Sequence, residues 1–81
     1  MFKIGKVSHF YDKIGVAIVE LDGNLATGDS VRFMKDGETL FEQVIDSIQV
    51  EHEKKDNASR GDVVGLKTNE VVKEGTEIFK I

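Results

Sequence analysis

One short sequence phrase occurs three times in this chain of 81 residues: an apolar residue, two spacers, Gly, a polar residue, one spacer and a β-branched residue. The copies run from Leu25 to Val31, from Ala58 to Val64 and, more loosely, from Val72 to Ile78. Each copy leads into a run of strand-forming residues. The phrase therefore predicts a tight turn that opens a β-strand.

The glycine and the polar residue of each phrase have defined roles in such a turn. Glycine adopts the positive φ that a Cβ atom disfavours, and an Asp or Thr oxygen can accept hydrogen bonds from turn amides. We expect structural turns at Gly28 with Asp29, at Gly61 with Asp62, and at Gly75. The two aspartates resemble a catalytic carboxylate pair, but their identical place after Gly favours a turn role for both.

Length and composition indicate one small domain, residues 1–81. The chain contains no Cys, which excludes disulfides and a thiolate zinc site, and a reducing cytoplasm fits this composition. No apolar run approaches the roughly 20 residues that span a bilayer. We expect a soluble cytoplasmic protein with no membrane partner. Its formal net charge of −4 has the wrong sign for general binding to nucleic acid.

Strand signals cover the chain, and no apolar pattern of helical period extends beyond two turns. We expect an all-β fold with six strands, at about 2–8, 15–21, 31–34, 39–51, 63–68 and 76–81. Because closure removes exposed strand edges, the economical arrangement is a single six-stranded antiparallel β-barrel, closed or nearly closed.

Several local features follow from the same patterns. Gly5 is expected at a bulge, and Asp36 with Gly37 is a clear hairpin signal. The long strand at 39–51 is expected to bend around a corner of the barrel, with a bulge or an exposed middle at Asp46. Its apolar residues Leu40, Val44, Ile48 and Val50 are all at even-numbered positions, which lie on one face of a regular strand. Residues 9–14 and 52–60 are expected to be surface loops, and Val16 and Ile18 form a second apolar face opposite Ala17, Val19 and Leu21.

The order of these phrases resembles the second domain of the translational GTPases, typified by elongation factor Tu. The residues that carry this likeness are Gly5, Val7, 15–21, 25–31, Gly61, Asp62, Val64, Gly65 and Leu66. A closer likeness is to the small barrel appended to the collagenase-like peptidase family and to free-standing elongation factor-like proteins. It is carried by Val7–Tyr11, Lys13–Val16, Phe41, Val44, Ser47, Gln49, Glu51 and His52. The resemblance implies a barrel of the translation-factor domain 2 type.

The resemblance to translation factors implies a non-enzymatic module that contacts RNA or a ribonucleoprotein, such as tRNA, ribosomal RNA or the ribosome. No Gly-rich phosphate loop follows any strand, so we expect no nucleotide binding. No nucleophile and base are assembled, so we expect no enzyme, no cofactor and no metal. The alternative is a protein-interaction module that docks on a partner enzyme, such as a collagenase-like family protein.

The candidate binding residues are rings and cations. His9, Phe10, Tyr11 and Lys13 could stack a base and hold a phosphate. Arg32, Lys54, Lys55 and Arg60 could extend a basic surface if they share a face. The alternative interpretation is structural: Phe10 or Tyr11 covers one end of the barrel, Lys13 is solvated, and the loop with Lys54 and Lys55 is an ordinary polar surface.

Overall fold

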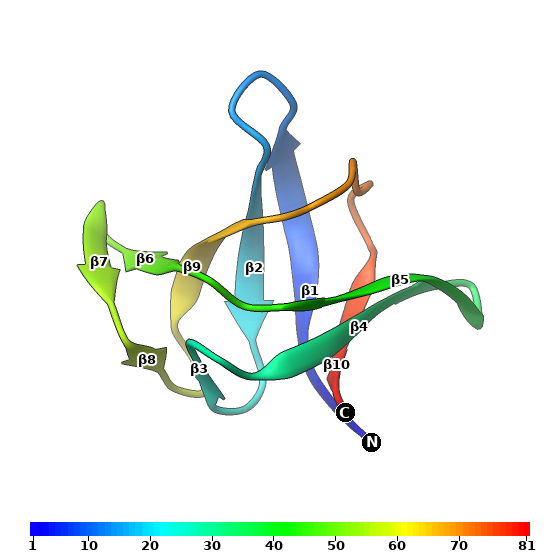
Figure 1. The fold of residues 1–81 in the computed structure, drawn as a ribbon, viewed down its shortest axis with the longest axis horizontal. Coiled ribbons are helices and arrows are strands. Elements are labelled where there is room, and N and C mark those ends of the chain that lie inside the picture. The colour runs from blue at the N-terminus through cyan, green and yellow to red at the C-terminus, as the bar shows by residue number, and fades with distance from the viewer.

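The chain folds almost entirely as β-strand. The computed structural model describes residues 1–81 and contains ten strands and no helix (Figure 1). The strands are β1 (Phe2–Tyr11), β2 (Val16–Leu21), β3 (Leu25–Ala26), β4 (Ser30–Lys35), β5 (Glu38–Val44), β6 (Ile48–Val50), β7 (Glu53–Lys55), β8 (Asn57–Ala58), β9 (Val63–Lys67) and β10 (Glu77–Lys80). The structure therefore has no helix that is long and apolar enough to cross a membrane.

Eight strands form one antiparallel sheet in the order β5-β4-β10-β1-β2-β9-β6-β7, and β3 pairs with β8 in a small second sheet. The all-β antiparallel class is confirmed, but the closed six-stranded barrel is corrected, because β5 and β7 remain edges of the large sheet. Only 45–47 separate β5 from β6, which lie toward opposite ends of the strand order. This short connection requires the sheet to curve. β5 and β6 form one bent ribbon in Figure 1.

This bend changes the side-chain parity of the expected long strand. Leu40 and Val44 are exposed, whereas Ile45 and Ile48 are fully buried. A regular strand places residues three apart on opposite faces, so burial of both isoleucines requires the irregular backbone between β5 and β6. The interruption expected at Asp46 is confirmed, because Asp46 is exposed and lies in the irregular segment between β5 and β6.

The three turn phrases adopt the same hydrogen-bonded structure. Their glycines have φ of 92°, 93° and 88°, in chain order from Gly28 to Gly75. The glycine amides donate to the carbonyls of Ile45, Leu21 and Val7, at 2.8, 3.0 and 2.8 Å respectively. The amides of those three residues donate back to the carbonyls of Asp29, Asp62 and Thr76. Each phrase is therefore anchored by two backbone hydrogen bonds to one buried residue.

The aspartates of the first two phrases act as turn caps. Asp29 Oδ2 accepts from the Ala26 amide, and Asp62 Oδ2 accepts from the Ser59 amide, both at 2.8 Å. The turn role expected for both residues is confirmed. The apolar residues that begin the phrases, Leu25, Ala58 and Val72, are buried in the core.

The core contains 15 buried apolar residues, with Phe33 the largest. Phe33 stacks on Phe41 with ring centroids 4.5 Å apart. The expected bulge in β1 is confirmed by the register shift between Lys3 and Gly5. A Cβ atom on Gly5 would lie 2.7 Å from Val19 Cγ1, so the close approach of β2 requires glycine here.

Two expected loops contain strand. His9, Phe10 and Tyr11 belong to β1 and pair with Ile18, Ala17 and Val16 of β2. Within 52–60, β7 pairs with β6 and β8 pairs with β3. The polar side chains there are exposed while the backbone is paired, which is why composition alone indicated loops. The hairpin at Asp36 and Gly37 is confirmed, with positive φ at both residues.

Candidate functional site

The ring residues expected in a binding loop divide between two faces of β1. Phe10 is half-buried and packs against the core. His9 and Tyr11 point outward with ring centroids 4.4 Å apart in an edge-to-face arrangement. Lys13 lies in the turn between β1 and β2 and is exposed. The structural alternative is therefore right for Phe10, whereas Tyr11 is 49% exposed.

The expected basic residues lie on different elements. Arg32 on β4 pairs with Glu42 of β5, with both Nε and Nη2 at 2.6 Å from Glu42 Oε2. Lys54 and Lys55 lie on β7, where Lys55 Nζ is 3.3 Å from Glu53 Oε2. Arg60 lies in the turn between β8 and β9. β4 and β7 lie well apart in Figure 1, so Arg32 does not join the lysines of β7 in one basic surface.

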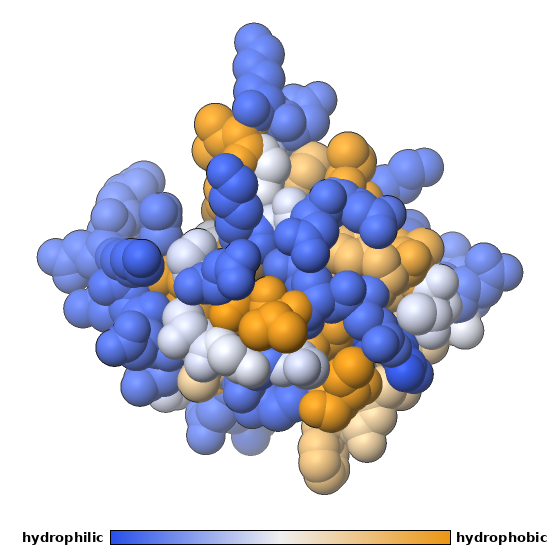
Figure 2. Space-filling view, in the orientation of Figure 1, coloured by the Kyte–Doolittle hydropathy of each residue, from blue (hydrophilic) through white to orange (hydrophobic).

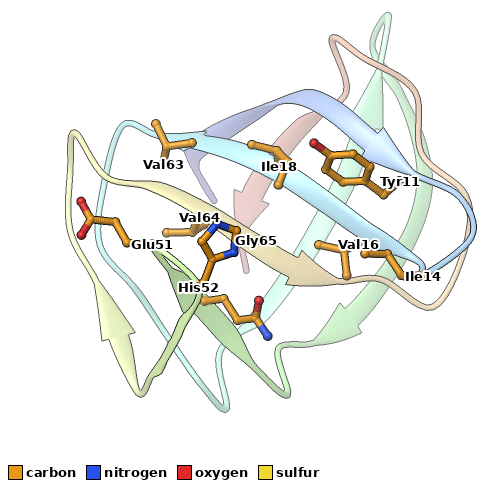
Figure 3. Close-up of a pocket in the computed structure, with 10 residues that line it drawn as sticks. Tyr11, Ile14, Val16, Ile18, Glu51, His52, Val63, Val64 and Gly65 are labelled. Atoms are coloured by element: carbon orange, nitrogen blue, oxygen red, sulfur yellow. The ribbon is translucent and has the colours of Figure 1, made fainter.

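An open groove of about 470 Å³ crosses the outer face of β2, β9 and β6 (Figure 3). Its lining residues are Tyr11, Ile14, Val16, Ile18, Gln49, Glu51, His52, Val63, Val64 and Gly65. Three of its apolar side chains are about half exposed or more: Ile14 at 59%, Val63 at 54% and Tyr11 at 49%. Sequence reasoning identified Tyr11 and the apolar face of Val16 and Ile18, but missed the contribution of β6 and β9.

Strand pairing explains how the groove is assembled. Ile18 of β2 pairs with Gly65 of β9, which pairs with Gln49 of β6. Val64 and Leu66 point into the core, so alternation directs Val63 and Gly65 outward. That alternation was the available signal for the missed residues. Alternation within β9 gives no information about its contact with β6, whose Gln49 lies 16 residues earlier in the chain than Gly65.

Gly65 forms a gap in the middle of the groove. A Cβ atom placed on it would lie 3.4 Å from Val16 Cγ1 and 3.9 Å from both Gln49 Cβ and Ile18 Cδ1. These are ordinary contact distances, so the fold does not exclude a side chain here. The absence of a side chain at Gly65 leaves space between Ile18 and Gln49.

The two ends of the groove carry opposite charges. Tyr11 and Ile14 lie at one end and Glu51 and Val63 at the other (Figure 3). Lys67 pairs with Val16 at the first end, and Glu20 pairs with Val63 at the second.

These charges are free of ion pairs within the chain. The five ion pairs are Lys3–Glu77, His9–Glu74, Arg32–Glu42, Lys55–Glu53 and Lys80–Asp29. None involves Lys13, Lys67, Glu20 or Glu51. All four side chains are exposed, and Lys6 of β1 lies directly across from Glu20 without forming an ion pair with it.

The turn between β6 and β7 brings two further polar side chains to the groove. Its central residues, Glu51 and His52, have φ of 52° and 66°. Such a two-residue hairpin turn favours Asn and Gly, because a Cβ atom disfavours positive φ. The structure contains no group of three or more His, Cys, Asp or Glu side chains that could hold a metal ion.

A second open groove of about 470 Å³ contains the exposed side chains of Leu40 and Val71, with charged residues making up the rest of its lining. On the face shown in Figure 2, orange patches are separated by hydrophilic atoms. Exposed apolar side chains outside the groove on β2, β9 and β6 include Leu40 and Val71, and Met1, Phe2 and Ile81 near the chain termini.

No family model matches the chain. One curated relative, the uncharacterized protease MJ0090 of Methanocaldococcus jannaschii, is 35% identical over 77 residues. The match covers 95% of this chain but only 19% of the length of MJ0090. The chain thus spans about a fifth of that relative.

Two solved structures have the same fold. Both are of the C-terminal domain of a protein of Geobacillus thermoleovorans assigned as a U32 peptidase, one being its selenomethionine variant. Each superposes with a TM-score of 0.88 over 96% of this chain, at 25% and 26% identity, and covers 98% and 90% of the solved chain. The expected likeness to the barrel of the collagenase-like peptidases is confirmed, and the likeness to translational GTPases stays a prediction. The chain is therefore homologous to the C-terminal domain of U32 peptidases, the collagenase-like family, and to part of the protease MJ0090.

Proposed function

We propose that this chain is a non-enzymatic β-domain that docks on the catalytic region of a U32 peptidase-type protein. The observation that carries the proposal is the apolar groove on β2, β9 and β6, where Ile14, Val63 and Tyr11 remain exposed on the isolated domain. Apolar surface of this kind, rimmed by polar residues, is typical of protein interfaces. The homology to the C-terminal domain of a larger protein supports the same conclusion.

The charge of the chain favours a protein partner over RNA. The net charge is −4, and two of the basic residues expected to hold phosphates, Arg32 and Lys55, already pair with carboxylates. Binding to a nucleic-acid backbone depends on cations that displace counterions from phosphates. Binding to tRNA, ribosomal RNA or the ribosome stays a prediction, and a gel-shift experiment tests it.

The test is a calorimetric titration of the 81-residue protein into MJ0090 from which the 77 matching residues have been deleted. If the matching residues dock on the rest of MJ0090, their deletion exposes that docking surface, so the proposal predicts a 1:1 complex. Intact MJ0090 is the matched control, and it should bind more weakly because its own segment occupies the site. Circular dichroism checks that the deleted protein is folded.

Two outcomes would count against the proposal. Equal affinity for intact and deleted MJ0090 would place any binding outside the proposed docking surface. A gel-shift complex with tRNA or ribosomal RNA that weakens as salt rises, together with no binding to deleted MJ0090, would favour the RNA-binding hypothesis instead. A chimera of MJ0090 that carries this chain in place of its own segment gives an independent measurement, since docking should protect the groove from hydrogen exchange.

A further inference from the structure

We propose that the groove receives a segment of the peptidase-type partner that has an aliphatic side chain at its centre, a basic residue at one end and an acidic residue at the other. This inference rests on the proposed function and adds where the partner binds and what chemistry it presents. It is carried by the gap at Gly65 and by the unpaired charges at the two ends of the groove.

The gap defines the centre of the partner segment. Val16 and Ile18 of β2 and Gln49 of β6 surround the space above Gly65. Val16 and Ile18 are half-buried apolar side chains, and Gln49 is exposed. An aliphatic side chain that enters this space would contact β2, β9 and β6 together. Buried central contacts of this kind dominate the free energy of protein interfaces.

The charges define the direction of the segment. Glu20 and Glu51 lie beside Val63 at one end, and Lys67 lies beside Val16 at the other, with Lys13 directly before Ile14. A partner segment with a basic residue over the glutamates and an acidic residue over the lysines would be complementary at both ends. The reverse orientation would bring like charges together, so the charges select one direction.

The hairpin turn between β6 and β7 supports partner binding at the end of the groove that contains Glu51. Glu51 and His52 both occupy the left-handed region, where Asn and Gly would be less strained, and both side chains line the groove. Asn and Gly at these positions would relax the turn but remove a carboxylate and an imidazole from the groove. Strained backbone is concentrated at functional sites, so the strain at Glu51 and His52 supports a role of their side chains in binding.

The experiment repeats the titration into deleted MJ0090 with variants of the 81-residue protein. Gly65→Leu fills the gap, and we expect Kd to rise at least about tenfold, as for a central interface residue. Gly65→Ala is the matched control with a smaller rise, because its Cβ fits the available space. Glu20→Lys and Lys67→Glu should each raise Kd, and the losses should shrink at high salt. Val71→Thr, outside the groove, should leave Kd unchanged.

The inference would be overturned if deleted MJ0090 binds the wild-type protein and all four groove variants with the same Kd. Docking would then take place elsewhere, while the proposed function would stand. A rise in Kd for Gly65→Leu, Glu20→Lys and Lys67→Glu that exceeds the rise for Gly65→Ala, with native circular dichroism, supports the inference, and protection of the groove in the chimera is the second readout. Self-association of the isolated chain that Gly65→Leu abolishes would assign the groove to a second copy and would also overturn the inference.

Discussion

At the scale of single residues, the turn aspartates have a stabilising role that can be measured. Replacing Asp62 with Ala removes the acceptor of the Ser59 amide hydrogen bond, which is 2.8 Å long. Because Asp62 is half-buried, we expect the free energy of unfolding to fall by about 1 kcal/mol in urea denaturation. Asp62→Asn keeps an acceptor oxygen and should retain most of the stability. Equal losses for both variants would show that the carboxylate charge, rather than the hydrogen bond, stabilises the turn.

The third turn phrase differs from the others at its polar residue. Thr76 is fully buried, and its Oγ1 has no hydrogen-bond partner. An unpartnered buried hydroxyl destabilises the fold, so Thr76→Val should raise the free energy of unfolding by about 1 kcal/mol.

Thr68 is the matched control for this prediction. It is also buried, but its Oγ1 donates to the Glu70 carbonyl at 2.7 Å. Thr68→Val should therefore lower the free energy of unfolding in the same denaturation experiment. A loss of stability in Thr76→Val as large as that in Thr68→Val would show that the Thr76 hydroxyl is satisfied.

At the scale of elements, the turn between β6 and β7 is a strained hairpin. Glu51 and His52 both have positive φ, which disfavours residues with a Cβ atom. Replacing the pair with Asn-Gly should raise the free energy of unfolding by about 1–2 kcal/mol. The turn at Asp36 and Gly37 is the control, because it already has a favoured sequence and Gly37→Ala should destabilise it. No gain from Asn-Gly would mean that contacts of the Glu51 or His52 side chain offset the strain.

The elements that the sequence predicts well are those set by local backbone geometry. The turn phrases, the bulge near Gly5 and the Asp36–Gly37 hairpin each depend on positive φ or on close backbone approach, which glycine reveals directly. An interruption of the strand was expected at Asp46, but the burial of Ile45 beside it was not predicted. Ile45 is held by backbone hydrogen bonds to the turn at Gly28 and Asp29, and a two-residue pattern contains no such information.

The candidate site was predicted only in part for a related reason. Val16 and Ile18 could be identified from alternation within one strand, and Tyr11 as a ring residue, although it was expected in a loop and lies in β1. Gly65 and Glu51 join them through the pairing of β2 with β9 and of β9 with β6. Such pairing between distant segments is not encoded in any local pattern, so the groove became visible only in the folded sheet.

At the scale of the whole molecule, the sheet depends on a strand formed by the end of the sequence. β10 lies between β4 and β1, although β1 contains the start of the sequence. The two outer parts of the large sheet, β5-β4 and β1-β2-β9-β6-β7, are therefore joined through β10. The groove lies entirely in the second part, so its shape depends on β10 through the support that β10 gives to β1.

Deleting residues 77–81 should therefore prevent cooperative folding of the entire chain. The deletion removes the fully buried Ile78 and leaves the facing edges of β1 and β4 without their ladder partners. We expect thermal unfolding followed by circular dichroism to lose its sigmoidal transition, because burial of the core and pairing of the two outer parts fail together. Deleting Ile81 alone, which is about half exposed, is the control and should keep the transition. A cooperative transition after the longer deletion would mean that β1 and β4 can pair directly and close the gap that β10 leaves.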